Sequence, residues 1–250
     1  MELGFRGEVA ELYRRYRRGY PPAVVGALVD VYGLTAADTV VDLGCGTGQL
    51  TEPLAAHVGR VLAVDPEPDM LAQVPPLPNV DRVAGRDSDL PVLLAGTSVA
   101  AVTVGQALHW MDHEALFRDI RPYLRAGGGV AVVTNGLPLW QQGSAWSRAL
   151  RATLADWFGV PLTSPCGTDE ASQDRYATAL TAAGYTVRRA TFAHTHHLTP
   201  DAVIGSVLSA TPADRLPADR TAFATAVRAA LAGHGPYVDA TPVTLLTGHR

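Results

Sequence analysis

The sequence predicts an α/β fold: one open, mostly parallel β-sheet with helices on both of its faces. Four short apolar runs rich in β-branched residues are typical of buried strands, and they lie at residues 39–43, 60–65, 99–105 and 130–134. A further strand is expected at residues 80–84. Helical patterns separate these runs, and strict alternation of strand and helix indicates parallel pairing. The chain has 250 residues, of which 47% are hydrophobic, so we expect a single domain over residues 1–250 with a substantial core.

Composition and charge exclude several classes of protein. No segment approaches about 18 uninterrupted apolar residues, so no membrane span is expected. Cys45 and Cys166 are the only cysteines, which disfavours a disulfide framework and favours a cytoplasmic location. A net charge of −4 argues against a nucleic-acid surface over the whole protein. His194, His196 and His197 cluster, but no acidic or cysteine partner has metal-ligand spacing, so no metal site is expected.

Residues 1–33 predict a helical cap ahead of the first strand. A first helix is expected over residues 1–20, with three tyrosines spaced three and four residues apart: Tyr13, Tyr16 and Tyr20. Pro21 and Pro22 open a second helix that ends near Gly33. The arginines between the tyrosines indicate a solvated basic face, and a short polybasic arm for nucleic acid is the alternative interpretation.

A glycine-rich turn follows the first strand directly. Its three glycines occupy alternate positions: Gly44, Gly46 and Gly48. Missing Cβ atoms let the backbone bend sharply there and let a ligand approach it, whereas a purely structural turn needs only one glycine. A helical pattern opens at Thr47 or Gly48 and continues through Leu54 and Val58, and the free N–H groups at its start favour a carboxylate or phosphate.

The second strand ends in an acid, Asp65, which precedes Pro66. Ligands of open parallel sheets bind outside the carboxyl ends of the strands, and an acid about 20 residues past the glycines can accept hydrogen bonds from ribose hydroxyls. An aspartate that only caps the following turn is the alternative. A nucleotide-dependent reductase is disfavoured, because the dinucleotide fingerprint needs its third glycine where this chain has Gln49.

The run from Val40 to Gly48, with an acid inside the strand and a second acid after the next strand, resembles the first motif of class I S-adenosylmethionine (SAM) methyltransferases. The spacing from Phe5 to Pro21 and the string Gln106-Ala107-Leu108-His109-Trp110 resemble a type 11-like branch of small-molecule methyltransferases. The resemblance implies a seven-stranded, Rossmann-like sheet with an antiparallel last strand. It also implies SAM as the cofactor and residues 39–135 as the SAM-binding core.

The resemblance also implies roles for individual residues. Tyr13 and Arg17 are expected near the methionine end of SAM, although the chain has Arg18 where the family usually has proline. Asp87 and Ser88 are expected near adenine, and they replace the alanine and glutamate of the family motif. The other cofactor-binding residues that the family implies are Asp42, Gly44, Gly46, Gly48, Asp65, Pro66 and Gln106.

When the atom that is methylated carries a proton, catalysis also requires a base that removes this proton. His109, in the turn that follows the fourth strand, is the first candidate base, with Tyr16 or Tyr20 as the second. A His109 that only packs against cofactor and helix is the alternative. An unperturbed imidazole would titrate near pH 6.5.

The last hundred residues predict additions to a minimal sheet. A helix through residues 116–124 is expected to end at glycines 127–129, and strands are expected at 185–193 and 238–247. Residues 137–168 and 199–235 predict helical insertions that form a substrate lid, with helices at 200–208 and 217–231 in the second of them. Trp146 and Trp157 in the first are either core residues or part of the acceptor pocket.

Taken together, these features predict SAM-dependent methyl transfer to a small-molecule acceptor, aromatic or apolar, in secondary metabolism. An RNA methyltransferase and a non-catalytic SAM-binding protein are the alternatives. Neither nucleic acid nor a membrane is expected as a partner, and the sequence leaves the oligomeric state open.

Overall fold

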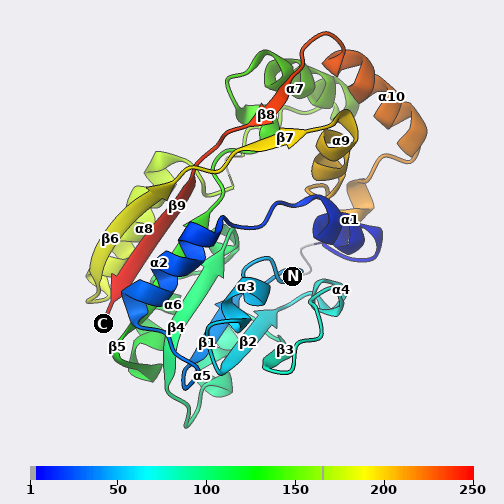
Figure 1. Ribbon diagram of the computed structural model, residues 1–250. Helices are drawn as coiled ribbons and strands as arrows, with labels where there is room; N and C mark the ends of the chain where they lie inside the picture. The colour runs from blue at the N-terminus through cyan, green and yellow to red at the C-terminus, as the bar shows by residue number, and fades with distance from the viewer. Residues whose placement is uncertain (1–3, 165) are drawn as a thin grey trace.

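The computed structural model describes residues 4–164 and 166–250, and a seven-stranded sheet forms its centre (Figure 1). The strand order is β3-β2-β1-β4-β5-β9-β6. In chain order the strands are β1 (Thr39–Leu43), β2 (Arg60–Asp65), β3 (Val80–Ala84), β4 (Val99–Gly105), β5 (Leu124–Thr134), β6 (Thr186–Phe192) and β9 (Val243–His249). Strands β1 to β5 pair in parallel with one another. Strand β9 runs antiparallel to both of its neighbours, β5 and β6. The predicted fold class is confirmed. The expectations for residues 1–3 and 165 lie outside the described residues.

Helices cover both faces of this sheet because its strands are apolar on both sides. Val41 packs into the layer of α5 (Leu90–Leu93), α6 (His113–Ile120) and α8 (Glu170–Ala182). The neighbouring Val40 packs into the opposite layer, with α2 (Pro22–Tyr32) and α3 (Thr51–Ala55). The short helix α4 (Pro68–Ala72) follows β2. Successive strand residues thus face opposite layers, as the pleat requires.

A second cluster of helices lies beyond the carboxyl ends of the strands, in the upper part of Figure 1. It contains α7 (Ala145–Phe158), α9 (Pro200–Leu208) and α10 (Arg220–Leu231), together with a two-stranded sheet of β7 (His196–Leu198) and β8 (Tyr237–Asp239). We call these five elements the cap. Buried apolar side chains form its separate core: Trp146, Leu150, Leu154, Val203, Ile204, Val207, Leu208, Phe223, Val227 and Leu231. Helix α1 (Glu8–Tyr16) packs on α9.

The boundaries of α1, α3 and α10 differ from the prediction. Helix α1 ends at Tyr16, because Arg17 is extended with φ −78° and ψ 127°, so Tyr20 lies outside the helix. Helix α3 begins at Thr51, after a turn through the glycines. Helix α10 begins at Arg220 and not at residue 217, because the Asp219 side chain accepts a hydrogen bond from the Ala222 N–H and caps the helix there.

Strand β5 begins six residues before its predicted start. The helical prediction through Leu124 was wrong: α6 ends at Ile120, and Leu124 already pairs with Val99 of β4. The glycines that suggested a helix end lie within the strand. A Cβ atom on Gly129 would lie 2.0 Å from the Gly248 carbonyl oxygen, so close backbone approach explains the missing side chain.

The last predicted strand is two strands. Residues 237–239 form β8 and pair with β7 in the cap, whereas residues 243–249 form β9 in the main sheet. The Asp239 carboxylate accepts hydrogen bonds from the backbone N–H and the hydroxyl of Thr241, which turns the chain between the two strands. Pro242 cannot donate a ladder hydrogen bond at this point.

Candidate active site

A cavity of about 520 Å³ opens between the sheet and the cap. Its floor is the carboxyl edge of the sheet, where the loops after β1, β2, β4 and β5 contribute side chains and backbone. Helix α1, the segment that follows it, and parts of α9, β7 and β8 form the roof. The strand order reverses between β1 and β4, and ligands of open α/β sheets bind at such a switch point.

The glycine turn after β1 presents backbone to this cavity. Gly44, Gly46 and Gly48 all have positive φ, at 65°, 56° and 91°. A Cβ on Gly44 would lie 2.5 Å from the Ala107 side chain, so no side chain fits there. A Cβ on Gly46 would point toward Met70 and Tyr13, both of which line the cavity. The described lining includes Gly44 and Gly46 but not Gly48, which packs against Val74.

Asp65 lies at the end of β2 with its carboxylate against the glycine turn. One carboxylate oxygen accepts a hydrogen bond from the Gly46 N–H and the other from the Glu67 N–H, each at 2.9 Å. Burial raises the pKa of this carboxyl, and the two hydrogen bonds act in the opposite direction. A carboxylate has about four acceptor positions, so each oxygen retains capacity for a ligand hydroxyl.

Two neighbours of Asp65 also line the cavity, Pro66 and Glu67. Sequence reasoning missed Glu67, whose side chain is buried. The signal that would have found it is its position in the same strand-end turn, because polar residues after a parallel strand face the ligand edge of the sheet.

Asp42 lines the cavity and also supports the turn from within. Its carboxylate accepts hydrogen bonds from the hydroxyls of Thr51 at 2.6 Å and Thr103 at 3.1 Å. It thereby ties β1 to α3 and β4. Burial raises the pKa of this carboxyl to about 6, and the two hydroxyl contacts lower it.

The loop after β3 supplies the far wall of the cofactor end. Asp87 lines the cavity and accepts a hydrogen bond from the Asp112 N–H at 3.3 Å. The described lining includes Asp87 but not Ser88, whose side chain is exposed. Of the two residues expected near adenine, only Asp87 therefore reaches the cavity with its side chain.

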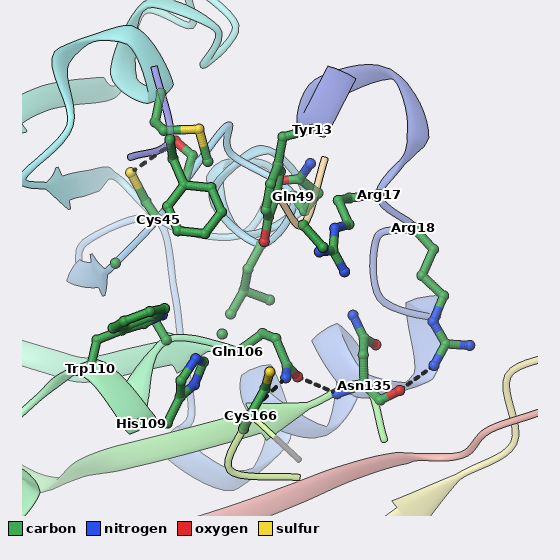
Figure 2. A pocket seen from close by; sticks show the side chains of 18 of the residues that line it. Tyr13, Arg17, Arg18, Cys45, Gln49, Gln106, His109, Trp110, Asn135 and Cys166 are labelled. Carbon is green, nitrogen blue, oxygen red and sulfur yellow. Dashed lines mark hydrogen bonds between the residues drawn. The ribbon is translucent and has the colours of Figure 1, made fainter. Parts of the chain in front are cut away.

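Tyr13 and Arg17 enter the cavity from α1 and the residue after it (Figure 2). The Arg17 guanidinium lies 5.1 Å from the centre of the Tyr13 ring. Its Nε is buried and finds no hydrogen-bond partner among the described residues. A buried donor of this kind calls for an anion or another acceptor in the cavity. The carboxylate of SAM is such a group, so the residues present fit this cofactor.

The turn after β4 places His109 in the cavity beside Trp110, with ring centres 5.0 Å apart (Figure 2). Burial lowers the pKa of the His109 imidazole to about 4, so the ring is neutral at physiological pH. The value near 6.5 applied only to an unperturbed imidazole, and the burial of His109 moves its pKa below that value. Trp110 is 53% exposed and stands at the rim of the cavity, edge-on to Phe5.

Gln106 holds the surrounding loops in place. It has a positive φ of 54°, which is unusual for a residue with a side chain. Its side-chain oxygen accepts a hydrogen bond from the Asn135 N–H at 2.8 Å, and its amide nitrogen donates to the Cys166 carbonyl at 3.5 Å. Gln106 therefore links the ends of β4 and β5 to the loop before α8.

The two tyrosines considered as bases both line the cavity but lie in different surroundings. The Tyr20 hydroxyl lies 2.7 Å from the position of a Cβ on Gly105, directly over the end of β4. Burial raises the pKa of Tyr20 well above 10.0, so this phenol stays protonated. The Tyr16 ring packs on Gly205 of α9, where no larger residue fits.

The acceptor side contains residues that sequence reasoning did not single out. The described lining includes Trp110 and Trp140 but neither Trp146 nor Trp157. Trp146 is buried in the cap core, edge-on to Tyr237, and Trp157 packs on Phe223. Further lining residues missed from the sequence are Asn135, Leu139, Cys166, His196, Leu198, Ser206 and Asp239. Asn135 directly follows β5, so the strand-end rule would have found it.

No group of three or more His, Cys, Asp or Glu in residues 4–164 and 166–250 is arranged to hold a metal ion. Within the same ranges, no helix combines the length and apolar character needed to cross a membrane.

Comparisons with known proteins agree with this geometry. Residues 40–128 match the family model of a methyltransferase domain. An uncharacterized methyltransferase of Mycobacterium tuberculosis is 34% identical over 236 residues, which cover 94% of this chain and 88% of that protein. The chain belongs to the class I SAM-dependent methyltransferases. SAM is therefore the cofactor of this methyltransferase.

Solved structures share the fold of this methyltransferase at lower identity. A chain assigned as a type II methyltransferase from Anaeromyxobacter dehalogenans has a TM-score of 0.58 at 24% identity, covering 94% of this chain and 97% of that one. A chain assigned as a methyltransferase from Anabaena variabilis has a TM-score of 0.62 at 19% identity, covering 92% and 98%. Both likenesses concern the fold alone.

Proposed function

We propose that this methyltransferase transfers the methyl group of SAM to a small-molecule acceptor with an aromatic or apolar body, as tailoring enzymes of secondary metabolism do. The observation that carries the proposal is the extent of the cavity. It continues past the cofactor-binding residues to a wall built by Leu139, Trp140 and Leu198. A volume of about 520 Å³ lies in the range of small-molecule sites.

The covered shape of the cavity argues against a large acceptor. Helix α1 and elements of the cap lie above the carboxyl edge of the sheet, so a folded RNA would have to displace them. The net charge of −4 also gives no general attraction to phosphates. We accordingly assign residues 39–135 to the SAM-binding core, and residues 1–33, 137–168 and 199–235 to the cover of the acceptor end.

The cofactor end has a group for each part of SAM. Asp65 offers carboxylate oxygens to ribose hydroxyls, and Gly44 and Gly46 leave the backbone open beside it. Arg17 offers a buried, unpartnered donor to the methionine carboxylate. Asp87, or backbone groups of Asp87 and Ser88, lie where adenine is expected.

The reaction needs orientation more than covalent help. Bound SAM supplies a methyl group on a sulfonium, and its transfer is an in-line displacement that depends on alignment and exclusion of water. His109 is neutral and can accept a proton from the acceptor, although its low pKa makes it a weak base. The raised pKa of Tyr20 disfavours it as a base, so His109 remains the first candidate and Tyr16 the second.

We also place the enzyme in the cytoplasm. The support is that Cys45 and Cys166 are both free thiols, and Cys45 lies buried in the glycine turn. Free thiols persist where the surroundings are reducing.

The test combines binding and turnover. Calorimetry with S-adenosylhomocysteine (SAH), the demethylated cofactor, should show one site per chain. Methyl-labelled SAM is then offered with a panel of aromatic and apolar small molecules, and separately with total RNA. Label in an organic extract supports the proposal, whereas label only in RNA contradicts it. SAH binding without transfer to any acceptor favours a non-catalytic SAM-binding protein.

A further inference from the structure

Arg18 joins three segments that are far apart in the sequence. Its guanidinium donates to the Asn135 carbonyl, which follows β5 (Figure 2), and to the Thr241 carbonyl between β8 and β9 at 3.2 Å. A third contact is an ion pair with the Asp239 carboxylate of β8 at 3.1 Å. One side chain thus connects the segment after α1 to the main sheet and to the cap.

The partner of Arg18 is itself held in place. The Asp239 carboxylate also accepts hydrogen bonds from the Gln142 side chain at 3.0 Å and from Thr241. Across the β7–β8 pair, Asp239 lies opposite His196. Asp239 is 5% exposed, so the ion pair is largely removed from water. We call Arg18, Asp239 and the carbonyls that Arg18 contacts the clamp.

Stability alone is a poor explanation for such a pair. Removing two charges from water costs about as much as their attraction returns, so a buried ion pair is weak evidence for stability. Its best-attested use is to fix one arrangement among several. Replacing both partners of a buried ion pair by apolar residues of similar volume is often neutral or stabilising, which indicates that the arrangement itself is what the clamp provides.

The arrangement that the clamp fixes is that of the cavity. Arg18, Asp239 and Asn135 all line its acceptor end. The chain is extended at Arg17, so successive side chains point to opposite sides. With Arg18 turned toward β8, Arg17 is turned toward Tyr13 and the cofactor end.

We propose that Arg18 is a positioning residue that couples the two ends of the cavity: by anchoring its segment to β5 and β8 it sets both the place of Arg17 at the cofactor and the wall that meets the acceptor. The acceptor part of this statement rests on the proposed function. Arg18 contacts neither reacting group in this role. A change at Arg18 is therefore expected to alter how cofactor binding at one end of the cavity affects the other end, and not the methyl-transfer step itself.

The test uses SAH, so it needs no identified acceptor. In the wild type, SAH should slow hydrogen exchange in residues 17–20 and also in residues 237–242, which include the clamp residues Asp239 and Thr241. In Arg18→Gln the protection of 237–242 should be lost, and SAH should bind about 2- to 30-fold more weakly, the range of coupling effects in proteins. Asp239→Asn should behave in the same way, and the double variant should be no worse than either single one.

Arg220→Gln is the matched control. Arg220 pairs with Glu8 at 3.0 Å, so it also joins the N-terminal segment to the cap, but both side chains are part-exposed and neither belongs to the described cavity lining. This variant should keep the wild-type SAH affinity and exchange pattern. If Arg18→Gln also keeps the wild-type SAH affinity and exchange pattern, and only its melting temperature is lower, the clamp is structural and the proposal is overturned.

Two outcomes separate this proposal from the proposed function. Should Arg18→Gln fail to fold, Asp239→Asn decides the question by the same readout. It keeps the shape of the side chain, removes its charge and replaces one acceptor oxygen with an amide donor. A wild type that shows SAH-linked protection at 237–242 but methylates no small molecule supports the clamp while contradicting the acceptor assignment. A wild type that binds SAH without protecting 237–242 overturns the clamp alone.

Discussion

At the end of β1 the cavity is lined by backbone, whereas at its opposite end it is lined by side chains from α1, β7, β8 and the loop after β5. Gly44 and Gly46 owe their role to the absence of a side chain, and Asp65 is fixed by backbone N–H groups. Arg18 and Asp239 instead owe their position to each other. A half built from backbone geometry tolerates few substitutions, whereas a half built from side chains can change its ligand by exchanging them.

The sharpest way to break this comparison is to add a side chain to the backbone-built half. Gly46→Val should abolish SAH binding while the protein stays folded, because φ 56° disfavours a β-branched residue and the side chain would enter the cavity. The backbone strain costs about 1–3 kcal/mol of folding stability. The loss of affinity comes instead from the valine side chain, which occupies space beside Met70 and Tyr13 in the cavity. Calorimetry measures the loss, and circular dichroism checks the fold.

Gly143→Val is the control in the loop before α7, where a Cβ meets no atom within 4 Å. It should bind SAH like the wild type. Normal binding by Gly46→Val as well would show that the turn is not the cofactor cradle.

His109 lies where the two halves meet, between the end of β4 and the loop before α8. His109→Ala should lower kcat by at least about 100-fold, the smaller effect typical of losing a general base, and leave SAM affinity within a few-fold. The exposed His197→Ala is the control. Unchanged kcat would make His109 structural, and a parallel loss of SAM binding would move it to the cofactor site.

The same residue predicts a pH dependence. The neutral ring is the form that accepts a proton, and burial lowers its pKa to about 4. In the wild type, titration of His109 should therefore leave kcat/KM unchanged as the pH falls through 6.5. It should lower kcat/KM only near pH 4. A decline centred near 6.5 that is absent in His109→Ala would show that the ring is not desolvated during the reaction.

Asp65 tests the backbone-built half with a smaller change. Asp65→Ala should weaken SAM and SAH by about ten- to a hundredfold, because losing a hydrogen bond to a charged group costs about 1.5–3 kcal/mol. Both cofactors should weaken equally, since they share the ribose. Asp156→Ala, which removes an exposed carboxylate outside the described cavity lining, separates a specific effect of Asp65 from a general loss of negative charge. Unchanged affinity in a folded Asp65→Ala protein would exclude the ribose role.

The two halves also differ in how far the sequence predicts them. The alternation of strands and helices predicts the main sheet. The positions of the glycines and of Asp65 follow from local sequence patterns, and no tertiary contact has to be known to predict them. The cap follows from packing between α7, α9 and α10, so Trp146 and Trp157 lie in its core or on its surface while Trp140 lines the cavity. Periodicity reports that a residue has an apolar face but not which neighbour covers it. The roles of the individual site residues stay predictions in both halves.

The smallest expected effect is a pH dependence confined to the cap. His194 and His196 contact each other through their Nε2 atoms, and Arg18 and Asp239 are the charged groups that face them. Burial and the Arg18 charge lower the pKa of both imidazoles, whereas Asp239 raises it; His196 also lowers that of His194. A group whose pKa is lower in the folded state binds its proton more readily when unfolded. Its contribution to stability is therefore complete above pH 6.5 and is lost as the pH falls below that value.

We expect the melting temperature of the wild type to fall more steeply between pH 7 and pH 5 than that of His194→Gln, by a few degrees at most. Other groups with shifted pKa, such as Asp42 and His109, titrate in both proteins and cancel in the difference. Hydrogen exchange should place the loss in residues 196–198 and 237–239, while β1 and β2 stay protected. Equal pH profiles for the two proteins would mean that the pair keeps its contact when protonated. Loss of protection in β1 would show that the cap and the sheet do not open separately, which would remove the distinction between the two halves.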